Sequence, residues 1–425
     1  MSLPKRKSLH EHINQRRNVD KYLYFYQVLK QRSYEFYKSL FADHSMPLAF
    51  VDLDLLDLNI KAILERAGDK KIRLASKSIR SRSVLEHILQ SDKRFQGIMC
   101  FTAGEAAWLA EMGLDDMLIG YPCLNKQDLY AISNQIAKGK KIVPMIDDVV
   151  QAELLNSIAK EKNITINVCI DIDMSTDFPR IHFGVFRSPI HTVEDVKILV
   201  EKLKQLSNIH IMGIMGYEAQ TAGVGDNLKG QRFKNATIRS LKRRSNKDYK
   251  KRREEIVEWL QKEGYDLQLV NAGGTGSLEL SAEEPWVTEI TVGSGFFSPG
   301  LFDHYSHFKH LPAAGFILQI VRIPKNEYFT CLGGGYIASG QTGVIKQPYP
   351  YLPEGVQPVK DEGFGEVQTP FKYTGNLSLK IGDPVLFRHA KAGELCEHFN
   401  YLSVVKDNAV TIPVNTYRGD GKSFL

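Results

Sequence analysis

The 425-residue sequence has little cysteine and no long apolar run, and each shortage argues against a class of protein. Its cysteines are few, odd in number and scattered, which indicates a reducing compartment rather than a disulfide framework. No stretch approaches the roughly 18 apolar residues of a membrane span. The basic N-terminus, MSLPKRKSLHEHINQRRN, is followed by no apolar segment, so it does not have the pattern of a secretory signal. We therefore expect a soluble, cytoplasmic protein with no membrane partner.

The sequence also lacks a strong imbalance between positive and negative charge, because the net charge of +6 is modest for this length. Much of that excess lies in one segment, 229–262, which is dense in lysine and arginine. Such a patch can bind nucleic acid. Its apolar residues nevertheless recur at roughly helical spacing, at Ile238, Leu241, Tyr249, Ile256, Val257 and Leu260. We therefore favour a helix with one buried stripe and a solvated cationic face over a nucleic-acid site.

The chain does contain a regular alternation of short apolar strands and amphipathic helices. Eight strands are predicted, at 72–76, 97–101, 117–121, 141–146, 166–172, 211–217, 267–271 and 289–293. Eight strands separated by helices over roughly 230 residues predict an α/β fold of the (β/α)8 barrel type. An open, doubly wound sheet is the alternative, because alternation alone does not establish closure.

The two ends of the chain have different patterns. Residues 1–45 predict a helical extension, and residues 46–305 hold the barrel pattern. Residues 306–425 contain strands separated by Gly, Pro and Asn, with almost no helical period. This segment predicts a separate C-terminal all-β domain.

Chemistry is indicated by one lysine and two glycine-rich turns. Lys77 follows the first barrel strand, where a charge is costly unless it is solvated, paired or used. NAGGTGS follows the seventh strand and VGSG ends the eighth. Consecutive backbone N–H groups in such turns bind phosphate, and barrels place phosphate sites there. A lysine facing a phosphate cradle predicts a phosphate-bearing aldehyde held as a Schiff base, either pyridoxal 5′-phosphate or a phosphorylated sugar.

Several stretches together resemble one known family. PLAFVDLDLLDLNI, RLASKS, FTAGEAAWLAEMGLDDMLIGYP, MGYEAQ, NAGGTGS and VGSGFFSPGLFDHY occur in the order of the fold-type III pyridoxal-phosphate enzymes. That family includes alanine racemase, D-threonine aldolase and D-serine dehydratase, and the likeness is closest to the aldolase and dehydratase branch. The resemblance implies pyridoxal 5′-phosphate as cofactor and a head-to-tail homodimer. It also implies a lyase acting on D-3-hydroxy amino acids such as D-threonine or D-serine.

The resemblance also assigns roles to individual residues. Lys77 is the covalent partner of the cofactor, and Tyr217 lies beside the cofactor ring. An arginine after the fifth strand reaches the cofactor oxygen or the substrate carboxylate, and either Arg180 or His182 takes that role here. The phosphate-binding loops comprise Gly274, Thr275, Gly276, Gly293 and Ser294.

In the aldolase and dehydratase branch, a His-x-Cys pair in the C-terminal domain binds a divalent metal. Here Glu394 stands at the histidine position, so the implied ligands are Glu394, Cys396 and His398. On a strand, residues two apart share a face, so the three could reach one zinc or manganese ion. His389 or His398 is then a plausible base, because imidazole titrates near neutral pH.

Two further readings stay open. An alanine-type racemase on the same fold needs a second base opposite Lys77, for which Tyr349, Tyr351, Tyr373 and Tyr417 are available. A non-catalytic cofactor-binding protein is the other reading, although such relatives are usually a lone barrel. Analysis of the reaction products distinguishes a lyase from a racemase.

Overall fold

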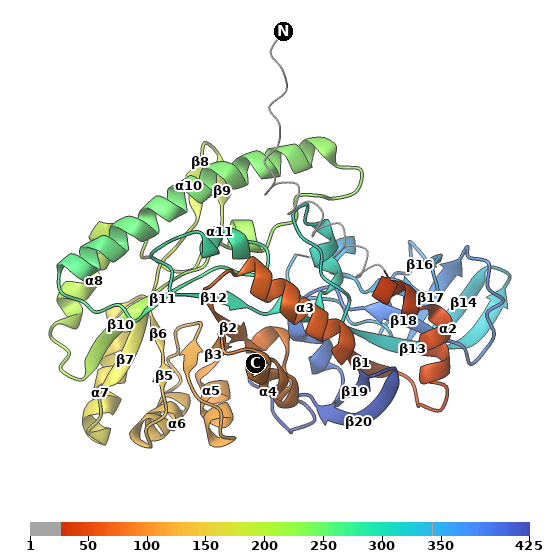
Figure 1. Cartoon of the computed structure of the whole chain (residues 1–425), viewed down its shortest axis with the longest axis horizontal. Helices are drawn as coiled ribbons and strands as arrows, with labels where there is room; N and C mark the ends of the chain where they lie inside the picture. The colour runs from red at the N-terminus through yellow and green to blue at the C-terminus, as the bar shows by residue number, and fades with distance from the viewer. Residues whose placement is uncertain (1–26, 342) are drawn as a thin grey trace, which may run out of the picture.

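The computed structural model describes residues 27–341 and 343–425, which form two nine-stranded sheets side by side (Figure 1) and one two-stranded hairpin. Most of the predicted N-terminal extension, residues 1–26, lies outside the described part. Its end forms helix α2 (Tyr34–Leu40), which begins where the Ser33 side chain accepts a hydrogen bond from the Phe36 N–H. Within the described ranges, no helix is long and apolar enough to cross a membrane.

The first sheet is the predicted barrel, and all of its strand pairs are parallel. The first strand pairs with the last, β2 with β12, which closes the sheet and makes the open-sheet alternative wrong. The fourth predicted strand is split at Pro144, so that its first half pairs with β4 and its second half with β7. The strands are β2 (Lys71–Ala75), β3 (Phe95–Cys100), β4 (Met117–Ile119), β5 (Ile142–Val143), β6 (Met145–Ile146), β7 (Ile166–Asp171), β10 (Ile209–Gly216), β11 (Leu269–Ala272) and β12 (Glu289–Val292).

Side chains fill the inside of the barrel, so it is a packed core and not a pore. An apolar cluster of barrel-strand residues contributes to this filling: Leu118, Val143, Met145, Cys169, Met212, Met215 and Leu269. Beside it lies a buried ion pair, in which Arg73 Nε is 2.6 Å from Glu289 Oε1. The Asn271 amide donates to the same carboxylate oxygen at 2.7 Å. Residues on neighbouring strands thus supply hydrogen-bond partners for the buried guanidinium and carboxylate groups.

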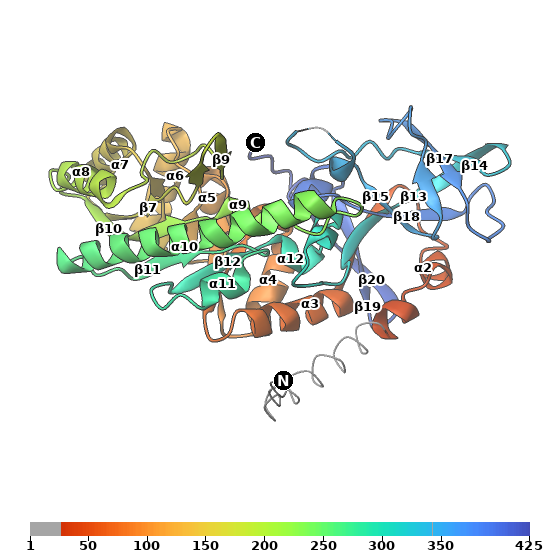
Figure 2. The same cartoon turned by 90° about the horizontal axis from the view of Figure 1, so that it is seen from above.

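Helices alternate with the barrel strands, as the sequence predicts, and cover the outside of the barrel (Figure 1). They are α3 (Leu53–Arg66), α4 (Arg82–Ser91), α5 (Ala103–Glu111), α6 (Lys126–Ala137), α7 (Val149–Lys162), α8 (Val193–Leu203) and α10 (Arg232–Lys262). Helix α10 is the predicted basic helix, and it runs along one side of the molecule (Figure 2). Its apolar stripe packs inward, but Lys242 and Arg253 are buried as well. The cationic face is therefore only partly solvated.

The second sheet forms the C-terminal domain, together with one strand from the start of the chain. Strand β1 (Leu48–Asp52) pairs antiparallel with β13 and parallel with β19, although the sequence assigns residues 46–305 to the barrel. The Asp52 side chain accepts from the Leu55 N–H at 3.1 Å and so begins α3, which leads to the barrel. The other strands are β13 (Ala314–Lys325), β14 (Tyr328–Leu332), β15 (Tyr349–Leu352), β16 (Val356–Pro358), β17 (Gln368–Tyr373), β18 (Pro384–Arg388), β19 (Tyr401–Lys406) and β20 (Ala409–Asn415).

Candidate active site

A cavity of about 480 Å³ opens at the C-terminal ends of the barrel strands. Its walls come from the turns after most barrel strands and from two lysines of the C-terminal domain. The cavity brings together seven residues that the sequence singled out: Lys77, His182, Tyr217, Gly274, Thr275, Gly293 and Ser294. Among the described residues that line it, none is Asp or Glu. The site therefore suits an anionic occupant.

Lys77 lies in a single 3-10 turn, η1 (Ser76–Ser78), directly after β2. Its Nζ donates a hydrogen bond to the Tyr121 hydroxyl at 2.8 Å. Burial alone would raise the pKa of Tyr121, but the charges of Lys77 and Arg187 outweigh it, so the pKa lies below its ordinary value. Tyr121 ends the stretch MLIGY, and its place at a strand end was the signal that the sequence offered for it.

Two glycine loops face Lys77 from the last two barrel strands. A Cβ at Gly293 would lie 2.7 Å from Ser78 Oγ, and one at Gly274 would lie 2.9 Å from the Ala222 Cβ. The loops are tied to each other, because the Gly295 N–H donates to Thr275 Oγ1 at 2.9 Å. Glycine at 274 and 293 therefore allows close packing at two positions that also line the cavity, where the backbone N–H groups of such turns can bind a phosphate.

Gly276 belongs to the same loop but plays a different part. It is not among the described residues that line the cavity. A Cβ there would lie 2.5 Å from the Ala222 carbonyl oxygen and 2.5 Å from the Tyr305 ring. Glycine at 276 therefore allows the loop to pack against its neighbours.

A buried polar network supports these loops from behind. The Glu218 carboxylate accepts from Ser277 Oγ at 2.8 Å and from Ser281 Oγ at 2.6 Å. The fully buried Arg253 of α10 lies 3.1 Å from the same carboxylate and also forms an ion pair with Glu284. The sequence placed this arginine on a solvated face, because a helical spacing of apolar residues does not reveal a buried ion pair.

The sequence proposed Arg180 or His182 for the role of the arginine after the fifth barrel strand, and the structure places these two residues differently. Arg180 is exposed and lies at the tip of the hairpin formed by β8 (Thr176–Phe178) and β9 (Ile181–Phe183), with φ of 67°. His182 lines the cavity. Arg187, five residues further on, also lines it, and its guanidinium lies 5.6 Å from the Tyr121 ring centre and 5.9 Å from that of Tyr217. Sequence reasoning missed Arg187, since spacing alone does not show how the hairpin returns to the barrel.

The proposed racemase tyrosines and His389 lie outside the lining of this cavity, as far as the structure describes it. The Tyr417 hydroxyl donates to Glu105 at 2.8 Å, and its pKa is raised by burial. The Tyr349 hydroxyl donates to the Ile345 carbonyl at 3.2 Å. His389 is buried with its ring edge-on to Phe297.

The three proposed metal ligands do not converge. They lie in and just after the 3-10 helix η4 (Ala392–Glu397), not on a strand, and at about 120° per residue side chains two apart point to different sides. The buried Cys396 Sγ lies 3.2 Å from the Ile79 carbonyl, and the Glu394 carboxylate accepts from the Ser339 N–H at 3.1 Å. His398 is exposed and packs on the Tyr336 ring. Across residues 27–341 and 343–425, no group of three or more His, Cys, Asp or Glu side chains could hold a metal ion.

Two lysines of the C-terminal domain were not expected at the cavity. Lys346 ends the 3-10 helix η3 (Val344–Lys346), and Lys391 precedes η4. Burial lowers the pKa of Lys346, and the like charge of Lys391 adds to this, against the opposing effect of Glu394. Two ammonium groups held close to each other are stabilised by a bound anion.

A buried carboxyl at the barrel mouth gives the first testable prediction. Burial raises the pKa of Asp171 from 3.8 to about 7, and the charge of Asp147 adds to this. The folded state thus keeps a proton that the unfolded chain loses, so stability falls as the pH rises through this window. Asp171→Asn removes that ionisation. The melting temperature of the variant, relative to that of the wild type, should therefore rise as the pH increases from about 4 to about 7. Thermal melts at pH 5 and pH 8 measure this, and equal shifts in both proteins would contradict it.

Comparison with known proteins places the fold. The alanine racemase N-terminal domain model matches residues 51–299, which is more than half of the chain. The 3-hydroxy-D-aspartate aldolase of Paracoccus denitrificans (strain Pd 1222) is 23% identical over 253 residues, which cover 59% of this chain and 60% of that protein. The match therefore spans less than two thirds of this curated relative.

Solved structures agree with this placement. D-threonine aldolase from Filomicrobium marinum superposes with a TM-score of 0.72 at 16% identity, covering 89% of this chain and 96% of that one. D-threo-3-hydroxyaspartate dehydratase from Delftia sp. HT23 gives 0.69 at 16% identity, with coverages of 88% and 98%. A variant of a D-threo-3-hydroxyaspartate dehydratase is also known in a metal-free form. At these identities the likeness establishes the fold, a (β/α)8 barrel with a C-terminal β-domain.

The chain therefore belongs to the alanine racemase N-terminal domain family, and the resemblance to fold-type III enzymes is confirmed.

Proposed function

We propose that this protein is a pyridoxal-phosphate-dependent lyase acting on D-3-hydroxy amino acids. The observation that carries the proposal is that Lys77 and two glycine loops line one cavity together. Pyridoxal phosphate carries an aldehyde and a phosphate on one flat ring, so its aldehyde suits Lys77 and its phosphate suits the glycine loops. The names of the relatives, two of which are aldolases and one a dehydratase, support a lyase.

The cofactor, when bound, supplies an electron sink for charge that develops at the substrate α-carbon. Lys77 is its covalent partner and afterwards moves the α-proton. The backbone around Gly274 and Gly293 binds the phosphate, helped by the hydroxyl of Ser294. Arg187, near the Tyr121 and Tyr217 rings, is placed to bind a carboxylate or an oxygen of the ring. No step of the reaction uses a metal held by Glu394, Cys396 and His398, because their donor atoms point apart.

We propose further that the protein is cytoplasmic and forms a homodimer. The five cysteines are free, which suits a reducing compartment. Light scattering of the purified protein tests the dimer.

The test of the function is product analysis. We would incubate the cofactor-loaded protein with D-threonine, D-serine and 3-hydroxy-D-aspartate, with and without divalent metal and with a chelator in parallel. Glycine plus an aldehyde identifies an aldolase, and ammonia plus a 2-oxo acid identifies a dehydratase. Formation of only the L-enantiomer would replace the lyase by a racemase, and no conversion of any of these substrates would overturn the proposal.

The cationic mouth of the cavity predicts a preference for acidic substrates. In the double variant Lys346→Met/Lys391→Met, kcat/KM for 3-hydroxy-D-aspartate should fall about tenfold or more, since hydrogen bonds to charged groups contribute about 1.5–3 kcal/mol. The value for D-threonine should change little. Lys360→Met is the matched control, because Lys360 is exposed in the same domain. Equal losses on both substrates would contradict a role in side-chain recognition.

A further inference from the structure

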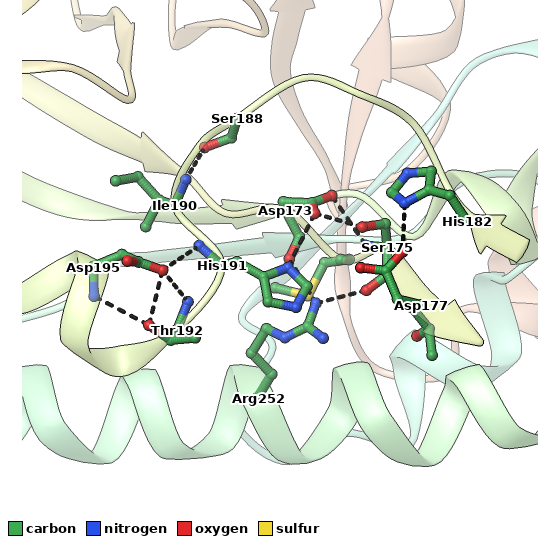
Figure 3. A network of polar contacts seen from close by, with 12 residues as sticks. Asp173, Ser175, Asp177, His182, Ser188, Ile190, His191, Thr192, Asp195 and Arg252 are labelled. Atoms are coloured by element: carbon green, nitrogen blue, oxygen red, sulfur yellow. Dashed lines mark hydrogen bonds and ion pairs between the residues drawn. The ribbon is translucent and has the colours of Figure 1, made fainter. Parts of the chain in front are cut away.

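The hairpin after the fifth barrel strand presents a histidine and a carboxylate as a pair. Asp177 on β8 and His182 on β9 are directly opposite in the hairpin register. His182 Nδ1 lies 2.8 Å from Asp177 Oδ1 (Figure 3). A carboxylate can only accept a hydrogen bond, so Nδ1 carries the proton and the lone pair of the neutral ring is on Nε2.

The second ring nitrogen, Nε2, is left without a partner by the described part of the protein. His182 lines the cavity wall, and its Nε2 is buried without a hydrogen-bond partner among the described residues. One face of the imidazole is covered by the Phe186 ring, with ring centres 3.9 Å apart and an angle of 16° between the planes. Buried polar atoms are nearly always hydrogen-bonded, so an orphaned nitrogen in a cavity wall indicates a bound partner.

The hairpin that carries this pair is anchored at its base (Figure 3). Arg252 of α10 donates to the carbonyl oxygens of Asp173 at 2.7 Å and of Ser175 at 2.9 Å. The Thr176 hydroxyl donates to Asp248 on the same helix at 2.8 Å. Helix α10 thus fixes the start of β8, which limits how far the imidazole can move relative to the barrel.

The charged groups around His182 fit a role in proton transfer. Asp177 is its counter-charge on β8, and Arg252 of α10 interacts electrostatically with that carboxylate. Within the cavity lining, the other charged groups are cations: Lys77, Arg187, Lys346 and Lys391. Strands β2 and β7 are the first and fifth of the eight, so Lys77 and the hairpin lie on opposite sides of the barrel mouth. A substrate held at Lys77 therefore has His182 across the mouth of the same cavity.

We propose that His182 is a catalytic acid–base residue for the substrate 3-hydroxyl and that Asp177 is its positioning residue. This inference rests on the proposed function. In cleavage, neutral Nε2 takes the hydroxyl proton while the carbonyl forms. The cofactor, when bound, would accept the electron pair of the broken Cα–Cβ bond, and a proton added to the α-carbon gives glycine. In elimination, protonated His182 gives its proton to the departing hydroxyl, which leaves as water, while Lys77 takes the α-proton.

The first test needs neither cofactor nor activity. Nitrogen-15 NMR of histidine-labelled protein reports which ring nitrogen carries the proton, and His182→Gln identifies the signal among the 12 histidines. We expect the Nδ1–H form in the wild type and a shift toward the Nε2–H form in Asp177→Asn. A wild-type protein with the proton on Nε2 would overturn the proposal, since Nε2 could then not accept a proton.

The second test is kinetic. His182→Gln should lower kcat by about 100-fold with little change in KM, because acid–base groups contribute about 10²–10⁴-fold. Asp177→Asn should lower kcat less, because the ring stays in place but loses the acceptor that fixes its Nδ1–H form. Added imidazole should restore part of the activity of His182→Ala. His87→Gln is the matched control, since His87 forms a similar pair with Asp57, 2.7 Å apart, on the outer helices.

The outcomes separate this inference from the proposed function. If the wild type forms no product, the proposed lyase and the role of His182 in it both fail. If the wild type is active and His182→Gln keeps its kcat, or only its KM rises, the inference fails and the lyase stands. Loss of α-proton exchange in deuterated solvent by His182→Gln would also overturn it, because His182 would then act on the α-carbon.

Discussion

Lys77→Ala is expected to lose all covalent attachment of pyridoxal phosphate and to lose activity at least about 1,000-fold. The Nζ atom is the amine that can join the cofactor aldehyde, and it afterwards serves as an acid–base group. Borohydride reduction followed by peptide mass analysis measures the attachment, and the absorbance of the bound cofactor gives a second readout. The cavity itself should remain, because the turn η1 is held by its backbone and not by the Lys77 side chain.

Two variants sharpen this experiment. Lys71→Ala changes the exposed lysine at the other end of the same strand and should keep the cofactor bond. Lys77→Arg keeps the positive charge but provides no amine that forms the bond, so it should behave like the alanine variant. A Lys77→Ala protein that is still labelled after borohydride reduction would show that another lysine holds the cofactor.

Arg253→Ala is expected to be the most damaging change away from the cavity. The guanidinium is fully buried between Glu218 and Glu284, and it also donates to the Gly216 carbonyl at 2.9 Å. Removing one partner of a buried ion pair leaves a charge without compensation and costs about 3–5 kcal/mol. The free energy of unfolding from urea titration measures this. Because Glu218 holds Ser277 and Ser281 behind the glycine loop, cofactor affinity should fall as well.

The control for this prediction lies on the same helix. Arg243 is exposed on α10, and Arg243→Ala should unfold at the same urea concentration as the wild type. The triple variant Arg253→Met/Glu218→Gln/Glu284→Gln should recover part of the loss, since it leaves no uncompensated buried charge. If Arg253→Ala were as stable as Arg243→Ala, the buried network would not support the site.

The sequence by itself determined the barrel, most of its helices and the centre of the site. Apolar periodicity distinguishes a buried strand from an amphipathic helix locally, and eight such units leave few ways to close a core. Lys77 and the glycine loops could be placed because each directly follows a strand, and all strands of a parallel barrel end on one face. These features depend on residues that are near in sequence.

The tertiary structure alone decided everything that depends on contacts between distant segments. It brought Arg187, Lys346 and Lys391 to the cavity, placed β1 in the second sheet and buried Arg253 between two carboxylates. It also replaced the strand assumed at Glu394–Cys396 by a 3-10 helix, which separates the implied metal ligands. Local spacing does not contain this information, because the direction of a side chain depends on the backbone conformation and its partner on how distant segments pack.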